Sequence, residues 1–280
     1  MNLKILCLMA FIIAVSKSWA LPTASLPAGF LFPNFSTAGL VNPAAMALDW
    51  RTEIALRYSP PLNANSSQNY LGSLGYSNDV WAFNAGYTGS YQNKAALHGA
   101  FGSASIHLWK LAFGIAARKP EVNSADPIEA DLSAVLKLTR KLRLGGSLYN
   151  LAGEKQVALG AGIGFPQKWT FAADVLFPFK PKGKSLADQW AATVAGSKYF
   201  ETFGYSLGLK YSRQQDGFNN EGNISAYGAW AQRLGRSLNL NLQYQTRPHA
   251  VTVGLTWLFA PSSGEYIRVI LDKDNDQLFN

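Results

Sequence analysis

The stretch SLNLNLQYQT, residues 237–246, places an apolar or aromatic side chain at every second position, from Leu238 to Tyr244. The positions between them hold asparagine and glutamine. Since successive side chains of a β-strand point to opposite faces, this stretch predicts a strand with one apolar face and one amide face. Each face needs its own environment in the folded protein.

The same alternation recurs from residue 51 to residue 259 in segments separated by Gly, Pro, Asn, Asp and Lys. The second face is persistently small or polar, as in residues 157–165, where it consists of alanine and glycine. No helix of ten or more residues is expected. The pattern predicts an all-β chain of fourteen antiparallel strands, at residues 51–58, 68–77, 80–89, 96–107, 109–118, 128–139, 141–151, 155–165, 168–177, 188–199, 202–212, 223–232, 237–246 and 249–259.

The links between these segments mostly alternate in length. Residues 59–67 and 119–127 form long links, whereas Asn78-Asp79 and Arg140 form tight ones, although 152–154 and 247–248 are shorter than the alternation requires. Bacterial outer-membrane barrels combine an even number of strands with tight periplasmic turns and longer outer loops. We therefore interpret residues 51–259 as a transmembrane antiparallel β-barrel, whose apolar strand faces contact membrane lipid.

Aromatic residues give a second indication of a membrane. Tryptophan and tyrosine concentrate where the apolar core of a bilayer meets water. In the predicted topology six tryptophans fall at periplasmic strand ends: Trp50, Trp81, Trp109, Trp169, Trp230 and Trp257. Trp190 falls at the outer side. Five tyrosines fall at outer ends, whereas two others, Tyr76 and Tyr199, fall at the periplasmic side; the five are Tyr58, Tyr70, Tyr87, Tyr211 and Tyr244. A soluble exported β-sandwich is the alternative for the strand pattern, but it explains neither this segregation nor the low content of charged residues, 15%.

The first twenty residues have the pattern of a secretory signal peptide. Lys4 precedes an apolar run from Ile5 to Val15, and Ser18-Trp19-Ala20 fits a cleavage site with small residues. We expect export to the bacterial outer membrane, so the formal net charge of +8 does not indicate nucleic acid as a partner. Cys7, the only cysteine of the chain, lies within this segment, which leaves no thiol chemistry for the mature protein.

Residues 28–58 resemble the N-terminal region of the FadL family of outer-membrane transporters for hydrophobic compounds. The similarity lies in Ala28-Gly29-Phe30 followed by residues 34–40, NFSTAGL, and in Asn42-Pro43-Ala44 before the first strand. The resemblance implies a fourteen-stranded barrel whose lumen is plugged by an N-terminal hatch, here residues 21–50. It also implies that Asn42, Pro43 and Ala44 belong to the hatch, and Gly29 and Phe30 to its mobile leading end.

Charged residues on the small, polar strand faces are expected to point into the lumen, because each Arg or Lys facing lipid near the midplane costs about 2–4 kcal/mol. Ion pairs between strands and with the hatch are one role for them, and a weakly anion-preferring pore is another. The residues assigned to the lumen by the alternation are Glu53, Arg57, Lys110, Arg118, Asp131, Lys137, Arg143, Asp174 and Lys210.

No catalytic, metal-binding or cofactor-binding residues are predicted. His98, His107 and His249 have no carboxylate or histidine at a metal-ligating spacing, and Ser103 and His107 are about 13 Å apart along a strand. The function predicted is passive, plug-gated uptake of small hydrophobic or amphipathic compounds. A general diffusion porin is one alternative, and a structural barrel that anchors a periplasmic partner through its C-terminal tail, residues 260–280, is another.

Overall fold

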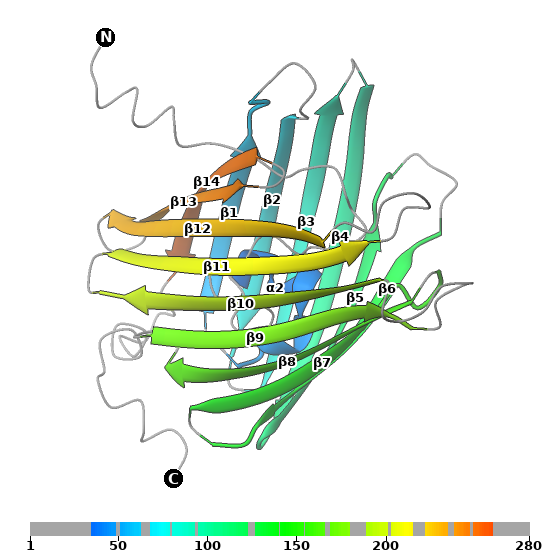
Figure 1. Ribbon diagram of the computed structural model, residues 1–280, viewed down its shortest axis with the longest axis vertical. Coiled ribbons are helices and arrows are strands. Elements are labelled where there is room, and N and C mark those ends of the chain that lie inside the picture. The colour runs from blue at the N-terminus through cyan, green and yellow to red at the C-terminus, as the bar shows by residue number, and fades with distance from the viewer. Residues whose placement is uncertain are drawn as a thin grey trace.

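The computed structural model describes residues 35–48, 51–62, 68–78, 80–92, 95–122, 127–139, 141–153, 155–165, 169–179, 189–200, 203–214, 222–234, 238–246 and 249–259. They form a closed barrel of fourteen strands (Figure 1). The strands are β1 Arg51–Ser59, β2 Gln68–Ser77, β3 Trp81–Gln92, β4 Ala95–Leu108, β5 Leu111–Lys119, β6 Glu129–Lys137, β7 Leu142–Tyr149, β8 Gln156–Phe165, β9 Trp169–Pro178, β10 Gln189–Tyr199, β11 Phe203–Gln214, β12 Gly222–Leu234, β13 Leu238–Thr246 and β14 His249–Phe259.

Every strand pairs antiparallel with its neighbour in the sequence, and β14 closes the barrel by pairing with β1. In that closing ladder Thr52 lies opposite Phe259 and Tyr58 opposite Val253. A closed sheet has no unpaired edge. Every strand of the barrel can therefore cross a bilayer with its backbone N–H and C=O groups hydrogen-bonded to neighbouring strands. The predicted fold class, a fourteen-stranded antiparallel β-barrel, is confirmed.

Burial alternates along the strands as the sequence pattern requires. In β5, Ala112, Gly114, Ala116 and Arg118 are buried, whereas the residues between them, such as Phe113 and Ile115, are exposed on the outer face. Small inward side chains leave space inside the barrel, and large apolar side chains cover its outer surface. This is the arrangement expected of a barrel surrounded by lipid.

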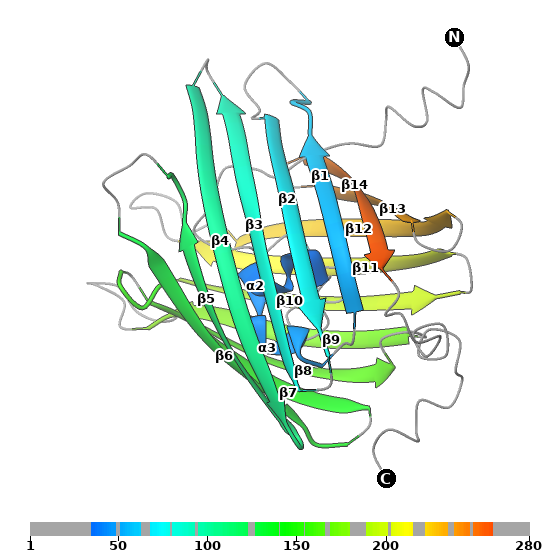
Figure 2. The same ribbon diagram turned by 180° about the vertical axis from the view of Figure 1, so that it is seen from behind.

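Two short helices occupy the lumen, as both views of the barrel show (Figures 1 and 2). Helix α2 spans Phe35–Val41, and helix α3 spans Pro43–Met46. Asn42 separates them, and Pro43 suits the first turn of α3 because its missing N–H has no partner there in any helix. We call residues 35–48 the luminal segment. It contacts β1 to β6, and none of the described helices is long and apolar enough to cross a membrane.

The two ends of the barrel differ. We call the end at which β1 begins the short-turn end; its links include residues 109–110 between β4 and β5 and residues 138–141 between β6 and β7. The opposite, long-loop end has links such as residues 120–128 and 179–188. Two links at the long-loop end, 93–94 and 247–248, have only two residues, so most but not all links follow the expected asymmetry between periplasmic turns and outer loops.

Outward-facing aromatic residues gather at both ends. At the short-turn end the rings of Tyr76, Trp81 and Phe83 pack together with centroid separations of 5.0 to 5.8 Å. At the long-loop end the rings of Tyr70 and Tyr87 stack at 6.1 Å. The two bands agree with the aromatic girdles of membrane barrels. Trp50, the proposed signal peptide and the C-terminal tail lie outside the described residues.

Candidate functional site

The candidate site is the contact between the luminal segment and the inward faces of β1 to β7, which we call the docking wall. Hydrogen bonds join them, among them one from Ser103 Oγ to Met46 Sδ over 3.6 Å. The Ala44 backbone N–H donates to Ser133 Oγ over 2.8 Å, and Ser77 Oγ donates to the Met46 carbonyl over 3.0 Å. The Tyr149 hydroxyl donates to the carbonyl of Val41, the last residue of α2. The wall thus satisfies backbone groups at helix ends, which have no partner within the helix.

Glycine allows the two backbones to approach closely. A Cβ atom at Gly114 of β5 would lie 2.3 Å from the Ala44 nitrogen and 2.4 Å from the Pro43 carbonyl carbon. A Cβ atom at Gly39 of α2 would lie 2.2 Å from Ser103 Oγ. At Gly114 the close atoms belong to the backbone of α3, so a larger residue there must displace the segment, whereas the Ser103 hydroxyl opposite Gly39 can rotate away.

Apolar side chains of the docking wall are covered by the luminal segment. Leu40, Val41 and Ala44 contribute to a buried cluster with inward-facing residues of the barrel, which we call the luminal apolar cluster. The barrel residues of this cluster are Leu71, Phe101, Ala112, Val135, Tyr149, Ala158 and Ala172. The luminal segment therefore shields these apolar side chains from water inside the barrel.

Some buried polar groups of the wall lack partners among the described residues. Asn84 is 1% exposed, and neither its amide nitrogen nor its amide oxygen has a hydrogen bond. The hydroxyls of Ser73 and Ser105 are also buried without a partner. A buried unsatisfied group costs about 1–3 kcal/mol, so these groups lower the stability of the observed arrangement.

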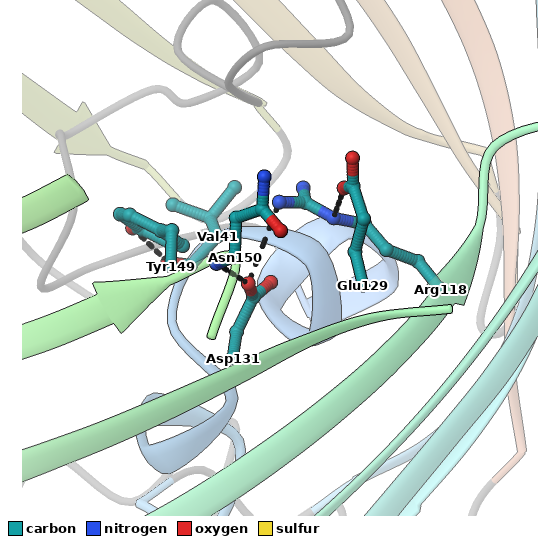
Figure 3. Close-up of polar contacts among 6 residues, drawn as sticks. All are labelled: Val41, Arg118, Glu129, Asp131, Tyr149 and Asn150. Atoms are coloured by element: carbon teal, nitrogen blue, oxygen red, sulfur yellow. Dashed lines mark hydrogen bonds and ion pairs between the residues drawn. The ribbon is translucent and has the colours of Figure 1, made fainter. Parts of the chain in front are cut away.

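A charged cluster lies at the long-loop end of β5 to β7 (Figure 3). Arg118 Nε is 2.6 Å from Glu129 Oε2, and Arg118 Nη2 is 3.4 Å from Asp131 Oδ1. The Asn150 backbone N–H donates to the same Asp131 oxygen over 2.8 Å. One arginine thus serves two carboxylates from the neighbouring strand, beside the Tyr149 hydroxyl that holds α2.

The residues predicted for the lumen have different surroundings. Glu53, Arg57, Arg118, Asp131 and Arg143 are buried on inward faces, and Lys137, Asp174 and Lys210 are partly buried there. Lys110 differs from the prediction, because it lies in the two-residue turn between β4 and β5. It is exposed, with its Nζ 4.9 Å from the centroid of the Trp109 ring.

Of the residues that the family resemblance places in the hatch, Asn42, Pro43 and Ala44 are buried in the lumen. Gly29 and Phe30 lie outside the described residues. The sequence analysis missed Gly114, Ser133, Tyr149 and Glu129. The alternation alone would have turned Glu129 and Tyr149 inward, but it does not indicate which inward residues meet the segment.

Replacing Arg118 by methionine is expected to destabilise the barrel by about 3 kcal/mol, because two largely buried carboxylates lose their cation. The measurement is urea unfolding of the protein in lipid vesicles. Adding Glu129→Gln and Asp131→Asn to Arg118→Met removes the uncompensated charges and is expected to restore most of the stability. Unchanged stability in the single variant would mean that the cluster is not a buried ion pair.

Comparisons with known proteins agree with this architecture. No protein family's sequence model matches the chain, and no curated protein matches it. Among solved structures, the Pseudomonas putida toluene transporter TodX is similar with a TM-score of 0.56 and 12% identity, over 81% of this chain and 94% of that one. A TodX deltaS2S3 mutant, described as a monoaromatic hydrocarbon channel, has a TM-score of 0.52 and 11% identity, over 85% and 97%.

A triple mutant of the Rhodopseudomonas blastica porin has a TM-score of 0.43 and 7% identity over 74% of this chain and 98% of that one, too low for a detailed comparison of the folds. TodX is a FadL-family transporter, so its likeness fits the resemblance seen in residues 28–58. At these identities the likeness shows the fold alone, that of a closed antiparallel β-barrel.

Proposed function

We propose that this protein provides a passive, plug-gated path across the bacterial outer membrane for small hydrophobic or amphipathic compounds. Residues 1–20 direct its export, and the luminal segment is the plug. The observation that carries the proposal is that this segment covers the apolar side chains of the docking wall. Its backbone groups bond to single side chains of the strands, an attachment that suits a segment able to leave and return.

A solute passes when its apolar surface replaces that of the luminal segment on the docking wall. When the segment leaves, Leu71, Phe101 and Val135 lose contact with Leu40 and Val41 and are exposed to water. Burying that surface against an apolar solute gives back a favourable free energy of about 25 cal/mol for each Å². The solute therefore competes with the plug for the luminal apolar cluster, while water satisfies Asn84 and the serine hydroxyls.

The likeness to TodX supports an apolar solute. The TodX proteins are described as a toluene transporter and a monoaromatic hydrocarbon channel. Fold alone does not give function. The proposal therefore also depends on the lumen, where buried apolar residues of the wall and of the plug form one cluster.

A general diffusion porin is the second candidate. It is favoured by charged side chains on luminal faces that the described helices do not cover. Asp174 of β9 and Lys210 of β11 both lie opposite Thr193 of β10, and the two charges interact. An open pore lined in this way would conduct ions, whereas a plugged one would not.

The test uses bacteria that lack their general porins and produce either the full chain or a variant without residues 21–44. We expect the full chain to increase entry of a fluorescent aromatic hydrocarbon through the lipopolysaccharide barrier, and to give little current in planar bilayers. The deletion is expected to give large, steady currents, because the segment no longer fills the lumen. Large currents from the full chain would instead identify a porin, and currents unchanged by the deletion would remove the plug.

A further inference from the structure

Lys198, an outward-facing lysine, lies among aromatic side chains at the short-turn end of the barrel. In the β-sheet ladders it is opposite Trp169 of β9 and Tyr205 of β11. Its Nζ is 5.9 Å from the centroid of the Phe200 ring. The side chains of Trp169, Tyr205 and Phe200 are 37%, 45% and 48% exposed, so the cluster is open to its surroundings.

A cation on the outer face of a membrane barrel must lie near a headgroup. Arg or Lys at the midplane costs about 2–4 kcal/mol, and this falls to nearly nothing at the interface. The aromatic neighbours of Lys198 are the residue types that prefer that level. Lys198 is exposed, and no carboxylate pairs with it among the described residues, which do not include Glu201.

The turn between β4 and β5 repeats this combination at the same end. Trp109 is 82% exposed and has a φ of 57°, a left-handed conformation that disfavours a residue with a Cβ atom. Lys110 lies over its ring. The Lys137 N–H donates to the Lys110 carbonyl over 2.8 Å, which fixes this turn to the start of the next one, where Lys141 is exposed.

The opposite end presents other groups beside its rings in the part of the chain that the structure describes. There the Tyr70 hydroxyl and His98 Nδ1 are 2.9 Å apart, and Tyr244 and His249 form the same pair at 2.9 Å. These polar groups already have partners. Among the described residues, the rings at the two ends therefore have different polar neighbours.

We propose that the short-turn end binds the phosphate of anionic phospholipids, with Lys198 as the principal site and Lys110 as a second one. The ammonium groups supply a point charge for the phosphate, and the adjacent rings pack against the glycerol and the first carbons of the acyl chains. This goes beyond the transport function, because these sites are on the outer surface and do not contact the luminal segment.

Native mass spectrometry of the full chain in detergent tests the proposal, with phosphatidylglycerol and phosphatidylcholine offered in equal amounts. We expect the unmodified protein to retain phosphatidylglycerol preferentially. Lys198→Gln and Lys110→Gln are each expected to lower that retention about fivefold, since one basic residue near a surface contributes roughly that factor. Lys198→Arg should keep it. The matched control is Lys155→Gln, at an exposed position of the long-loop end.

Equal retention of the two lipids by the unmodified protein would overturn the proposal. So would an equal loss in the Lys155→Gln control, which would reflect net charge and not a site. Capture of an acidic periplasmic protein by Lys198 without any preference between the lipids would assign the lysine to a protein partner and contradict the lipid assignment. Uptake of the aromatic hydrocarbon is expected to be unchanged in all four variants, which separates this proposal from the transport function.

Discussion

Valine in place of Gly114 is expected to open the barrel. The new Cβ would lie 2.3 Å from the Ala44 nitrogen, and the rest of the side chain would extend further into α3. The neighbouring atoms belong to a backbone, so they cannot rotate away, and the segment must move off the wall. The hydrogen bond from Ala44 to Ser133 is then lost.

Such overpacking costs about 1–3 kcal/mol, which lowers the ratio of closed to open barrels roughly 5- to 150-fold. We expect more frequent openings in planar bilayers and faster uptake of the aromatic hydrocarbon. Heat-modifiable mobility in gel electrophoresis, which reports an intact barrel, should be retained, because the clash is with the luminal segment and not with a neighbouring strand.

Gly102→Val is the matched control for Gly114→Val. Gly102 lies on the neighbouring strand β4, and a Cβ atom there would meet nothing within 4 Å. This variant is expected to conduct and to take up solute as the unmodified protein does. If Gly114→Val remained folded but gave the same bilayer currents and hydrocarbon uptake as the unmodified protein, close docking of α3 on β5 would not be what keeps the barrel closed.

Cysteines introduced at positions 39 and 103 are expected to lock the barrel shut. A Cβ atom at Gly39 would be 3.2 Å from Ser103 Cβ, a few tenths of an ångström short of the separation of about 3.5–4.5 Å usual in disulfides. Cys7 is the only cysteine in the chain and lies in the predicted signal peptide, so the introduced pair has no competing thiol after export. Oxidation of the Gly39→Cys, Ser103→Cys variant would tie α2 to β4.

We expect hydrocarbon uptake by the oxidised variant to fall to the level of cells without the protein, and reduction by a membrane-permeant thiol to restore it. The single Ser103→Cys variant should be insensitive to both treatments. Undiminished uptake through the oxidised form would show that solute passes without movement of α2, and the plug-gated mechanism would have to be abandoned.

The barrel could be predicted from the sequence because side chains alternate between the inward and the outward face along each strand. A shift of one residue in register exchanges all outward and inward side chains, so apolar residues such as Leu238 and Leu240 fix which face meets lipid. Strand β13 accordingly spans Leu238–Thr246, against the predicted 237–246. The alternation of long and short links gave the predicted direction of the strands across the membrane, and the tryptophan and tyrosine positions were a check on it.

Turns are less predictable, as Lys110 illustrates. The alternation extends through residues 109 and 110, which led to a predicted strand at 109–118 with Lys110 inward. In the structure Leu108 pairs with Leu111, and residues 109–110 form the turn. Trp109 adopts a positive φ there, although such a turn position is normally glycine or asparagine, so the sequence contains no ordinary turn signal.

The candidate site could be predicted only in part. The family resemblance pointed to Asn42, Pro43 and Ala44 as hatch residues, and they are buried in the lumen. Their partners on the wall, Gly114 and Ser133, have the same small inward character as many other positions of the barrel. Which small residue receives the helix depends on the position of the segment in three dimensions, and no local pattern encodes it.

The most direct test is the yield of the disulfide in the Gly39→Cys, Ser103→Cys variant, measured by mass spectrometry after mild oxidation of outer-membrane fragments. The structure predicts nearly complete formation of this bond, and none when Gly39→Cys is combined with Gly102→Cys, because residue 102 faces outward on the same strand. Free thiols at both positions 39 and 103, reacting readily with a bulky reagent, would contradict the placement of the luminal segment against the barrel wall.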